Sequence, residues 1–570
     1  MDEITTRARL KSRKSALWNE RSSWITHWRE ISDNLMPRSG RFFTSDRNRG
    51  QKKHNNIYDS TAGKALNTLT SGLMAGMTSP ARPWFRLAVP DPNLMKLGPV
   101  KTWLDDTTTL MRDIFARSNT YRSLHSMYRE LGGFGTGASL ILDDFEDVIR
   151  LHPLTVGEYA IATNDKGVVD TLYREFDVTV GNLVREFGFV GETQTPKRKP
   201  KDKRDGVSMT VKNLHESGTL DAWVTIMHVI EPREDRDTKA KDNRNMAYKS
   251  TYFESSSTDD VALREGGFTS FRAIVPRWDV SGGDIYGNSP AMEALGDIKQ
   301  LQHEQLRKSE VIDYQTKPPL QLPMAMKNGE SDLLPGGTSY YDPTMPSGGI
   351  RTAFNVDLRL DFLLQDIQDV RGRIKENFFA DLFMMIANDQ RSNITAREIA
   401  ERHEEKLLML GPVLERLHNE MLSPLIDITF DRVVEAGILP PPPPEMQGMD
   451  LQVEFVSMLA QAQRAVGTSS IDRLIGTIGS IAQMKPDVLD KLDHDQLVDK
   501  YADMLGVDPD LILADDKVAI IRKGRADQQA QAQRAAMMPQ AVDSAKTLSE
   551  IPADAEGTVL SNLTRQFTQL

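Results

Sequence analysis

The feature that most constrains this fold is a pair of long helical segments separated by a short proline- and glycine-rich stretch. The first segment begins at Ser289-Pro290, where serine is a favourable N-cap and proline a favourable first helical residue. It ends before Lys317-Pro318-Pro319, and residues 318–356 show little periodicity. The second segment covers about residues 357–386. Because the connection is short, the two helices are expected to run antiparallel.

The second segment is apolar around most of its circumference. Its apolar positions are Leu358, Phe362, Leu363, Ile367, Val370, Ile374, Phe378, Leu382 and Phe383. A surface helix needs only one apolar stripe, so this helix is expected to be buried on more than one face.

Residues 1–280 are predicted to form an α+β unit in which helices precede antiparallel strands. Helices are predicted over about 7–35, 60–78 and 100–117, and a fourth helix carrying Tyr121 and Leu131 is expected to stop at Gly132 and Gly133. The predicted strands cover residues 139–142, 148–151, 159–163, 168–176, 222–230, 246–254 and 271–275. The sequence NDKG at 164–167 predicts a hairpin between two of them.

The last third of the chain is mainly helical. After the polar stretch 387–394, a long helix is predicted from Thr395, which begins a capping box with Glu398, to about residue 438. Pro412, preceded by Gly411, predicts a kink in it. Five prolines at 440–444 mark a domain boundary. Residues 445–515 are predicted to be helical again, and the Gln-, Ala- and Ser-rich tail 516–570 to be partly helical or disordered.

A search for chemistry finds no catalytic, metal-binding or cofactor-binding motif. AGKALNT at 62–68 lacks the upstream glycine and the hydroxyl residue of a P-loop, and GGFGTGAS at 132–139 follows a helix, the reverse of a dinucleotide-binding turn. The chain has no cysteine, and its ten histidines show no ligand spacing. We therefore expect no enzyme activity, no cofactor and no metal. Without a signal peptide or membrane-spanning run, the protein is expected to act in a cytoplasm.

The charge of the chain argues against tight, static binding to DNA. Its formal net charge is −11, whereas a protein that grips DNA tightly usually carries a basic excess. One segment departs from this balance, because six of the eight residues from Lys197 to Arg204 are basic. That segment is either a solvated loop or a contact with nucleic acid or a partner.

The order of these segments resembles that of portal proteins, the head-to-tail connectors of short-tailed bacteriophages. The resemblance covers about residues 1–515. It is carried by DIYGNSPAMEALGDIKQLQ (284–302), SNITAREI (392–399), GPVLERLHNEMLSPLID (411–427), the Trp24-x₃-Trp28 helix and SGLMAGMTSPARPWFRL (71–87).

The resemblance implies a homo-oligomeric ring of twelve subunits at one vertex of the capsid, assembled in the host cytoplasm and retained in the virion. Its channel would let the packaging motor bring the genome in, retain it, and release it on ejection. The implied partners are double-stranded DNA without sequence specificity, the major capsid and scaffolding proteins, the terminase large subunit, and tail adaptor or nozzle proteins. No membrane is involved.

The resemblance also implies a portal-type fold with named regions. The wing is 1–283 together with the kinked helix 395–438. The stem helices are 284–316 and 357–386, and the clip between them is 317–356. The tunnel loop is 387–394, the crown 445–515, and the tail 516–570.

Four groups of site residues follow from this assignment. The loop side chains expected to touch the DNA backbone are Asn388, Asp389, Gln390, Arg391, Ser392 and Asn393. The basic stem residues that could line the channel are Lys299, Arg307, Lys308, Arg371, Arg373 and Lys375. The clip residues expected to meet the motor or adaptor are Lys317, Pro318, Pro319, Tyr340 and Tyr341, and the helix kink is placed at Gly411 and Pro412. A ring of acidic chains with few basic contacts would let DNA slide.

Two other functions are weighed against this one. An adaptor or scaffold protein would be smaller or more uniformly helical and charged, and the α+β first half argues against it. A metal-dependent nuclease would need clustered Asp, Glu and His at ligand spacing, which the sequence does not show.

Overall fold

The computed structural model describes residues 6–42, 56–91, 94–189, 206–237, 242–257, 262–321, 351–352, 360–388, 410–446 and 451–456, with shorter stretches up to 532. The chain divides into two compact units. The larger is Met1–Arg86, Thr107–Pro440 and Val453–Leu489, and the smaller is Leu87–Asp106, Pro441–Gln452 and Asp490–Leu570. Among the described helices, none combines the length and the apolar character that crossing a membrane requires.

The N-terminal helix forms as predicted, with one interruption. It is α1 (Thr6–Glu20) and α2 (Ser22–Asn34), separated only by Arg21. Trp28 is fully buried, its indole N–H donates to the Phe134 carbonyl over 2.9 Å, and its ring meets Tyr286 edge-on at 5.1 Å. The tryptophan stripe is therefore core packing, as its helical spacing indicates.

Three further helices complete this region: α3 (Thr61–Met77), α4 (Gly98–Arg117) and α5 (Thr120–Phe134). The expected stop at Gly132 and Gly133 is wrong, because both lie inside α5 and the helix ends at Gly135, whose φ of 77° is left-handed. A Cβ on Gly132 would stand 2.7 Å from Leu66, and one on Gly133 2.2 Å from Met36. These two glycines serve close packing, and only Gly135 serves as the cap.

Two antiparallel sheets follow. β2 (Ala138–Asp144), β3 (Val148–Leu154) and β9 (Ala273–Ile274) pair in the order β3-β2-β9. A five-stranded meander contains β4 (Tyr159–Thr163), β5 (Val169–Thr179), β6 (Trp223–Pro232), β7 (Tyr248–Glu254) and β8 (Arg264–Phe268) in chain order. The NDKG hairpin is confirmed between β4 and β5. The sequence did not predict β8, α6 (Val180–Phe187) or α7 (Met209–Glu216).

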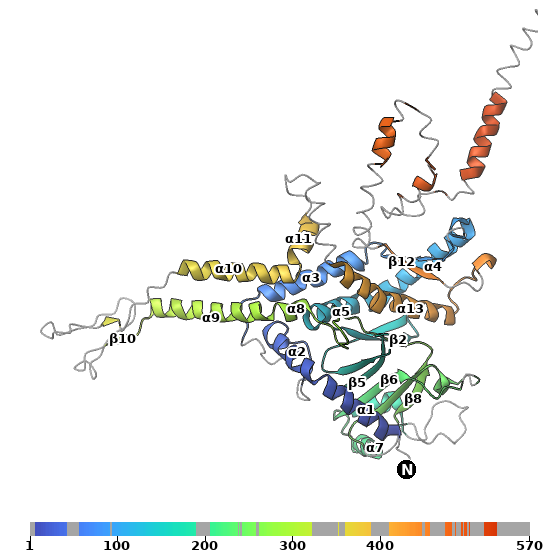
Figure 1. Ribbon diagram of the computed structural model, residues 1–570. Helices are drawn as coiled ribbons and strands as arrows, with labels where there is room; N and C mark the ends of the chain where they lie inside the picture. The colour runs from blue at the N-terminus through green and yellow to red at the C-terminus, as the bar shows by residue number, and fades with distance from the viewer. Residues whose placement is uncertain are drawn as a thin grey trace, which may run out of the picture. The chain divides into compact units, whose positions relative to one another are not determined.

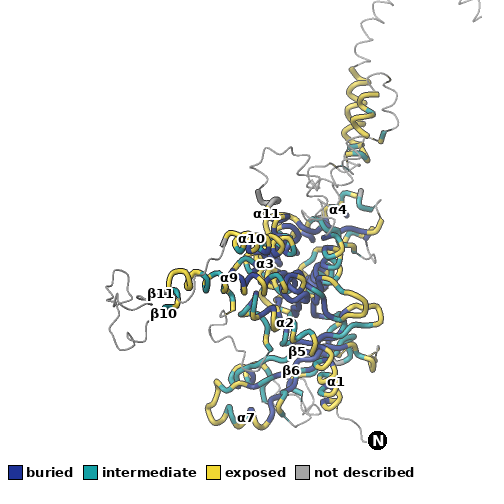
Figure 2. Tube along the Cα trace, turned by 60° about the vertical axis from the view of Figure 1, so that its left-hand side comes forward, coloured by how far each residue is buried: buried dark blue, intermediate teal, exposed yellow. Residues whose placement is uncertain are grey.

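The five-stranded sheet is covered by helices that meet alternate residues of its strands. Leu10 and Leu17 of α1 pack with Met227 and Val229 of β6. The neighbouring residue Ile226 packs instead with α6 and α7. This period of two is the expected signature of a strand buried on both faces. In Figure 2 the buried stretches gather around β5 and β6, whereas the outer end of α9 is exposed.

The two long helices form a hairpin that extends from the rest of the larger unit (Figure 1). Ser289 caps α8 (Pro290–Glu293), and its hydroxyl accepts from the Met292 amide over 3.1 Å. Next come α9 (Leu295–Thr316), β10 (Leu320–Gln321), β11 (Arg351–Thr352) and α10 (Leu360–Asn377). β10 and β11 pair antiparallel, so the predicted antiparallel return of the second helix is confirmed. We call α9 and α10 together the arm.

The predicted helix 357–386 is wrong as a single element. It breaks at Phe378 and Phe379, and a separate helix, α11 (Ala380–Asn388), turns away from the axis of α10 (Figure 1). Phe379 has a φ of 52°, a left-handed value that ends a helix and that glycine usually supplies.

The long C-terminal helix is irregular just before Pro424. Residues 410–417 are α-helical, His418–Leu422 form a π-helical turn, and α13 (Ser423–Glu435) continues. The Ser423 amide donates to the His418 carbonyl, five residues back. Pro424 has no N–H for a regular helical bond to residue 420, which accounts for the wide turn before it. The turn preceding Gly411-Pro412 lies outside the described residues, so the kink there stays a prediction.

The helical prediction for 445–515 is wrong at its start. After the prolines comes a short 3₁₀ turn (Pro444–Met446), and Gln452–Phe455 form strand β12, which pairs with β1 (Phe85–Ala88). The Val456 amide donates to the Trp84 carbonyl over 3.0 Å, and Arg86 pairs with Glu454 at 2.7 Å. Farther on, residues 518–532 are helical and exposed, as expected for the start of the tail.

Candidate channel-forming site

The base of the arm is fixed by Asp59, which lies just before α3. The Asp59 carboxylate accepts from the Arg371 guanidinium of α10 at 2.6 and 3.1 Å and from the Thr61 amide at 2.7 Å. Gln302 of α9 accepts from the Asp59 amide at 2.8 Å and donates to its carbonyl at 2.9 Å. The Asp59 side chain is only 6% exposed. One residue thus ties α3 to both helices of the arm.

Four of the six basic arm residues predicted to line a channel are paired within the chain. Lys299 contacts Glu30 at 2.6 Å, and Arg307 contacts Glu310 at 2.6 Å. Arg371 is held by Asp59, and Arg373 lies between Asp297 and Asp369 at 3.1 and 2.7 Å.

Lys308 and Lys375 differ from these four. Neither forms an ion pair with another residue that the structure describes. Among the basic residues of the arm they are therefore the ones whose charge the described part of the chain leaves unmatched.

The apolar side chains of α10 are buried near its base and exposed toward its tip. Near the base, Ile367, Val370, Ile374 and Phe378 are buried. Toward the tip, Phe362 is 66% exposed. The prediction that this helix buries more than one face therefore does not hold for the outer part of α10 within a single chain. Leu358 lies outside the described residues.

The predicted loop and clip are described only at their edges. Asn388 is the last residue of α11, while Asp389, Gln390, Arg391, Ser392 and Asn393 lie outside the described residues. Lys317 caps the end of α9, with its amide donating to the Asp313 carbonyl over 2.7 Å. Pro318 and Pro319 lead into β10, and Tyr340 and Tyr341 lie outside the described residues. The basic segment 197–204 also lies outside them.

The long helix is attached near the start of the arm through Arg277 and Glu420. Arg277 donates to the Glu420 carboxylate through Nη2 at 2.6 Å, Nε at 3.2 Å and its backbone N at 2.9 Å. Its Nη2 also donates to the Gly167 carbonyl over 2.8 Å, and its side chain is 5% exposed. No local pattern in the sequence indicates this pair, because its members lie 143 residues apart and Glu420 belongs to the π-helical turn.

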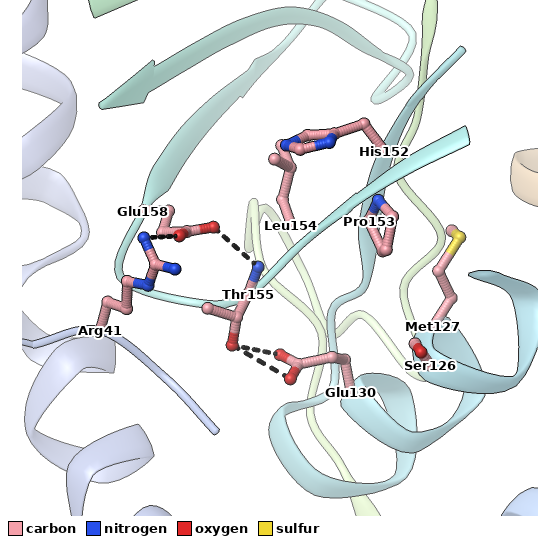
Figure 3. A pocket seen from close by; sticks show the side chains of 9 residues that line it. All are labelled: Arg41, Ser126, Met127, Glu130, His152, Pro153, Leu154, Thr155 and Glu158. Carbon is pink, nitrogen blue, oxygen red and sulfur yellow. Dashed lines mark hydrogen bonds and ion pairs between the residues drawn. The ribbon is translucent and has the colours of Figure 1, made fainter. Parts of the chain in front are cut away.

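A pocket of about 300 Å³ lies between α5 and the β3–β4 connection (Figure 3). Arg41 pairs with Glu158 at 2.5 Å, and the Thr155 hydroxyl lies 3.0 Å from the Glu130 carboxyl. The Gly40 amide donates to Thr155 over 2.9 Å. Burial lowers the pKa of His152 to about 4, so its imidazole is neutral at pH 7. The described residues contain no group of three or more potential ligands placed to hold a metal. The pocket's contacts hold the segment around residues 40–42 in place.

Glu130 provides a pH-dependent prediction. Burial raises the pKa of Glu130 to about 8, although hydrogen bonds from Thr155 and Val156 act in the opposite direction. The unfolded chain ionises this group near pH 4.5 while the folded chain keeps the proton, so the folded state loses stability as pH rises from about 4.5 to 8. Glu130→Gln should therefore raise the free energy of unfolding by about 1–3 kcal/mol at pH 9 and change it little at pH 4.

Urea denaturation at both pH values measures this effect. Glu146→Gln, at the exposed tip of the β2–β3 hairpin, is the matched control. An equal response of the two variants at pH 9 would show that Glu130 carries no such penalty.

The chain matches the family described as "Bacteriophage head to tail connecting protein" over residues 7–513 and belongs to that family. It is 58% identical over 568 residues to the "Probable portal protein" of Bordetella phage BPP-1, covering 100% of both chains. It is 45% identical over 547 residues to the "Portal protein" of Salmonella phage epsilon15, covering 96% of both chains.

Proposed function

We propose that this chain is the subunit of a phage portal, a twelve-membered ring at one capsid vertex whose central channel carries double-stranded DNA. Family membership over most of the chain and two relatives named as portal proteins support this function. In this role the ring is part of the virion, joins the capsid to the tail, and is built in the host cytoplasm.

The observation that carries the ring proposal is the apolar surface at the outer part of the arm. Ile312 and Tyr314 of α9 are 41% and 46% exposed, and Phe362 and Leu364 of α10 are 66% and 39% exposed. Large apolar side chains exposed on neighbouring helices mark an interaction surface. A neighbouring arm, placed by rotation about a ring axis, would cover them with a heterologous contact that closes on itself.

The regions of the chain then take the following roles. The arm is the stem, residues 317–356 are the clip that meets the terminase large subunit during packaging and the tail adaptor afterwards, and residues 1–283 with the long helix form the wing. Capsid and scaffolding proteins contact the outside of the ring. Residues 445–515 are the crown.

Charge supports a channel that does not hold DNA tightly. Twelve copies of a chain with a net charge of −11 make an acidic ring, and four of the six basic arm residues are already paired. Loop residues 388–393 would supply transient backbone contacts without reading sequence. Loss of DNA from filled heads carrying Arg391→Ala is the test of that role, and unchanged retention contradicts it.

Electron microscopy of the purified protein tests the ring directly. End-on views should show a closed ring of twelve or a neighbouring number of subunits, with a channel wide enough for a duplex. Monomers or dimers, both alone and after co-expression with the scaffolding protein, would contradict the proposal.

A matched pair of variants tests whether the exposed apolar surface of the outer arm is the contact between subunits. Phe362→Ser should reduce the fraction of protein in rings, because its side chain is the most exposed apolar one among the described residues of the arm. Phe145→Ser, at an even more exposed phenylalanine on the β2–β3 hairpin, should leave that fraction unchanged. Equal behaviour of the two variants would argue that the outer arm is not the contact between subunits.

A further inference from the structure

The junction between α10 and α11 combines a strained residue with close apolar packing. We call the surface of α3 and Trp278 against which α11 packs the seat of α11. Phe379 has a φ of 52°, and its amide closes the end of α10 by donating to the Glu376 carbonyl over 2.9 Å. An L-residue with a side chain pays for this left-handed conformation, and glycine is the usual occupant. Neighbouring contacts must therefore hold Phe379 in place.

The contacts that hold the bend come from α3 and from Trp278. Leu382 and Phe383 of α11 are buried, and the Phe379 ring lies 6.3 Å from that of Trp278. Gly72 of α3 lies directly against Phe383, because a Cβ at Gly72 would stand 2.2 Å from the phenylalanine ring. The seat for α11 thus depends on the absence of a side chain at position 72.

The local sequence favours a different conformation. Residues 374–388, IKENFFADLFMMIAN, contain neither glycine nor proline, and they predict one helix continuous with α10. Straightening would relieve the left-handed residue and restore the helical hydrogen bonds at the junction, but it would withdraw Leu382 and Phe383 from their seat. Two arrangements of the same segment are therefore each favoured by different interactions, which defines a bistable element.

We infer that α11 is a two-position element, which is either seated against α3 and Trp278 with Phe379 left-handed, or continuous with α10 with Phe379 helical. The described structure is the seated position. The inference concerns a single chain and does not depend on ring formation. Since α11 leads into residues 389–394, its swing would move the predicted DNA loop, a consequence that does rest on the proposed function.

The chain's lack of cysteine allows a direct distance measurement. Spin labels at Gln365→Cys in α10 and Met384→Cys in α11 occupy exposed positions on either side of the junction. A continuous helix separates these Cα atoms by about 28 Å, and the bend shortens that separation. Labelled protein diluted into a large excess of unlabelled protein reports distances within one chain, whether or not rings form.

Two variants at position 379 isolate the free-energy cost of the left-handed backbone conformation. Phe379→Gly and Phe379→Ala both remove the ring, but glycine accepts the left-handed conformation and alanine favours the helix. The ratio of bent to straight chains should therefore be about 5- to 30-fold higher in the glycine variant than in the alanine variant. Identical distance distributions for the two variants would overturn the inference.

A second pair tests the seat without touching the junction. Gly72→Ala places a methyl group against Phe383 and should increase the population near 28 Å. Gly63→Ala is the matched control in the same helix, because a Cβ there meets nothing within 4 Å. Since alanine favours helix at both positions, both variants should fold. A single bent distance in both Gly72→Ala and Phe379→Ala would show that α11 has only one position.

Discussion

Replacing Glu420 by alanine should lower the free energy of unfolding by about 3–5 kcal/mol, the largest effect expected of any substitution proposed for this chain. Arg277 is 95% buried at its side chain and depends on Glu420 for three of its hydrogen bonds. Without the carboxylate, the guanidinium keeps, among the described residues, the Gly167 and Ile285 carbonyls as partners, at 2.8 and 3.4 Å. A buried cation without its counter-charge is the costliest state of such a pair.

Guanidinium chloride denaturation measures this loss, with Glu415→Ala as the control on the same helix. Glu415 is exposed, so its replacement should change stability by no more than about 0.5 kcal/mol. Glu420→Gln should fall between the two, because the amide oxygen can still accept one hydrogen bond but carries no charge. Comparable losses for Glu415→Ala and Glu420→Ala would mean that the Arg277 pair does not anchor the helix.

The features that the sequence predicts correctly depend on local interactions. The serine cap at Ser289, the NDKG hairpin and the antiparallel return of the arm each follow from residues close together in the chain. The errors at α5 and α11 have a different origin. Gly132 and Gly133 are inside a helix because Leu66 and Met36 approach closely, and Phe379 is left-handed while α11 is seated beside Gly72. In both places tertiary packing overrides local propensity.

The candidate site was harder to predict because its contacts are long-range. Nothing local indicates that Lys299 meets Glu30, that Arg371 meets Asp59, or that β12 joins β1 across more than 360 residues. The local sequence around a basic helical residue does not show whether the side chain faces solvent, a neighbouring chain or a buried carboxylate. The sequence therefore predicted which residues carry charge on the arm, but not which of those charges are already neutralised.

The second large effect is expected at Asp59. Asp59→Ala should lower the free energy of unfolding by about 2–4 kcal/mol at pH 7, less than Glu420→Ala because the Arg371 side chain is 30% exposed. The substitution leaves the Thr61 amide and the Arg371 guanidinium without their shared acceptor. Asp369→Ala is the matched control, since its partner Arg373 keeps Asp297 and the Asp369 side chain is 65% exposed. Its cost should stay below about 1 kcal/mol.

The pH dependence of this loss distinguishes the carboxylate from the volume of the side chain. Burial opposes ionisation of Asp59, but hydrogen bonds from Thr61 and Arg371 outweigh it and hold its pKa below the ordinary value of 3.8. A lowered folded-state pKa contributes stability above the unfolded pKa, and this stability is lost as pH falls through the folded value. The difference between wild type and Asp59→Ala should therefore be constant from pH 5 to 8 and shrink below pH 4. A difference that stays constant down to pH 2.5 would assign the effect to packing alone. A shrinking difference would show that the ionised Asp59 carboxylate stabilises the attachment of the arm through its contact with Arg371.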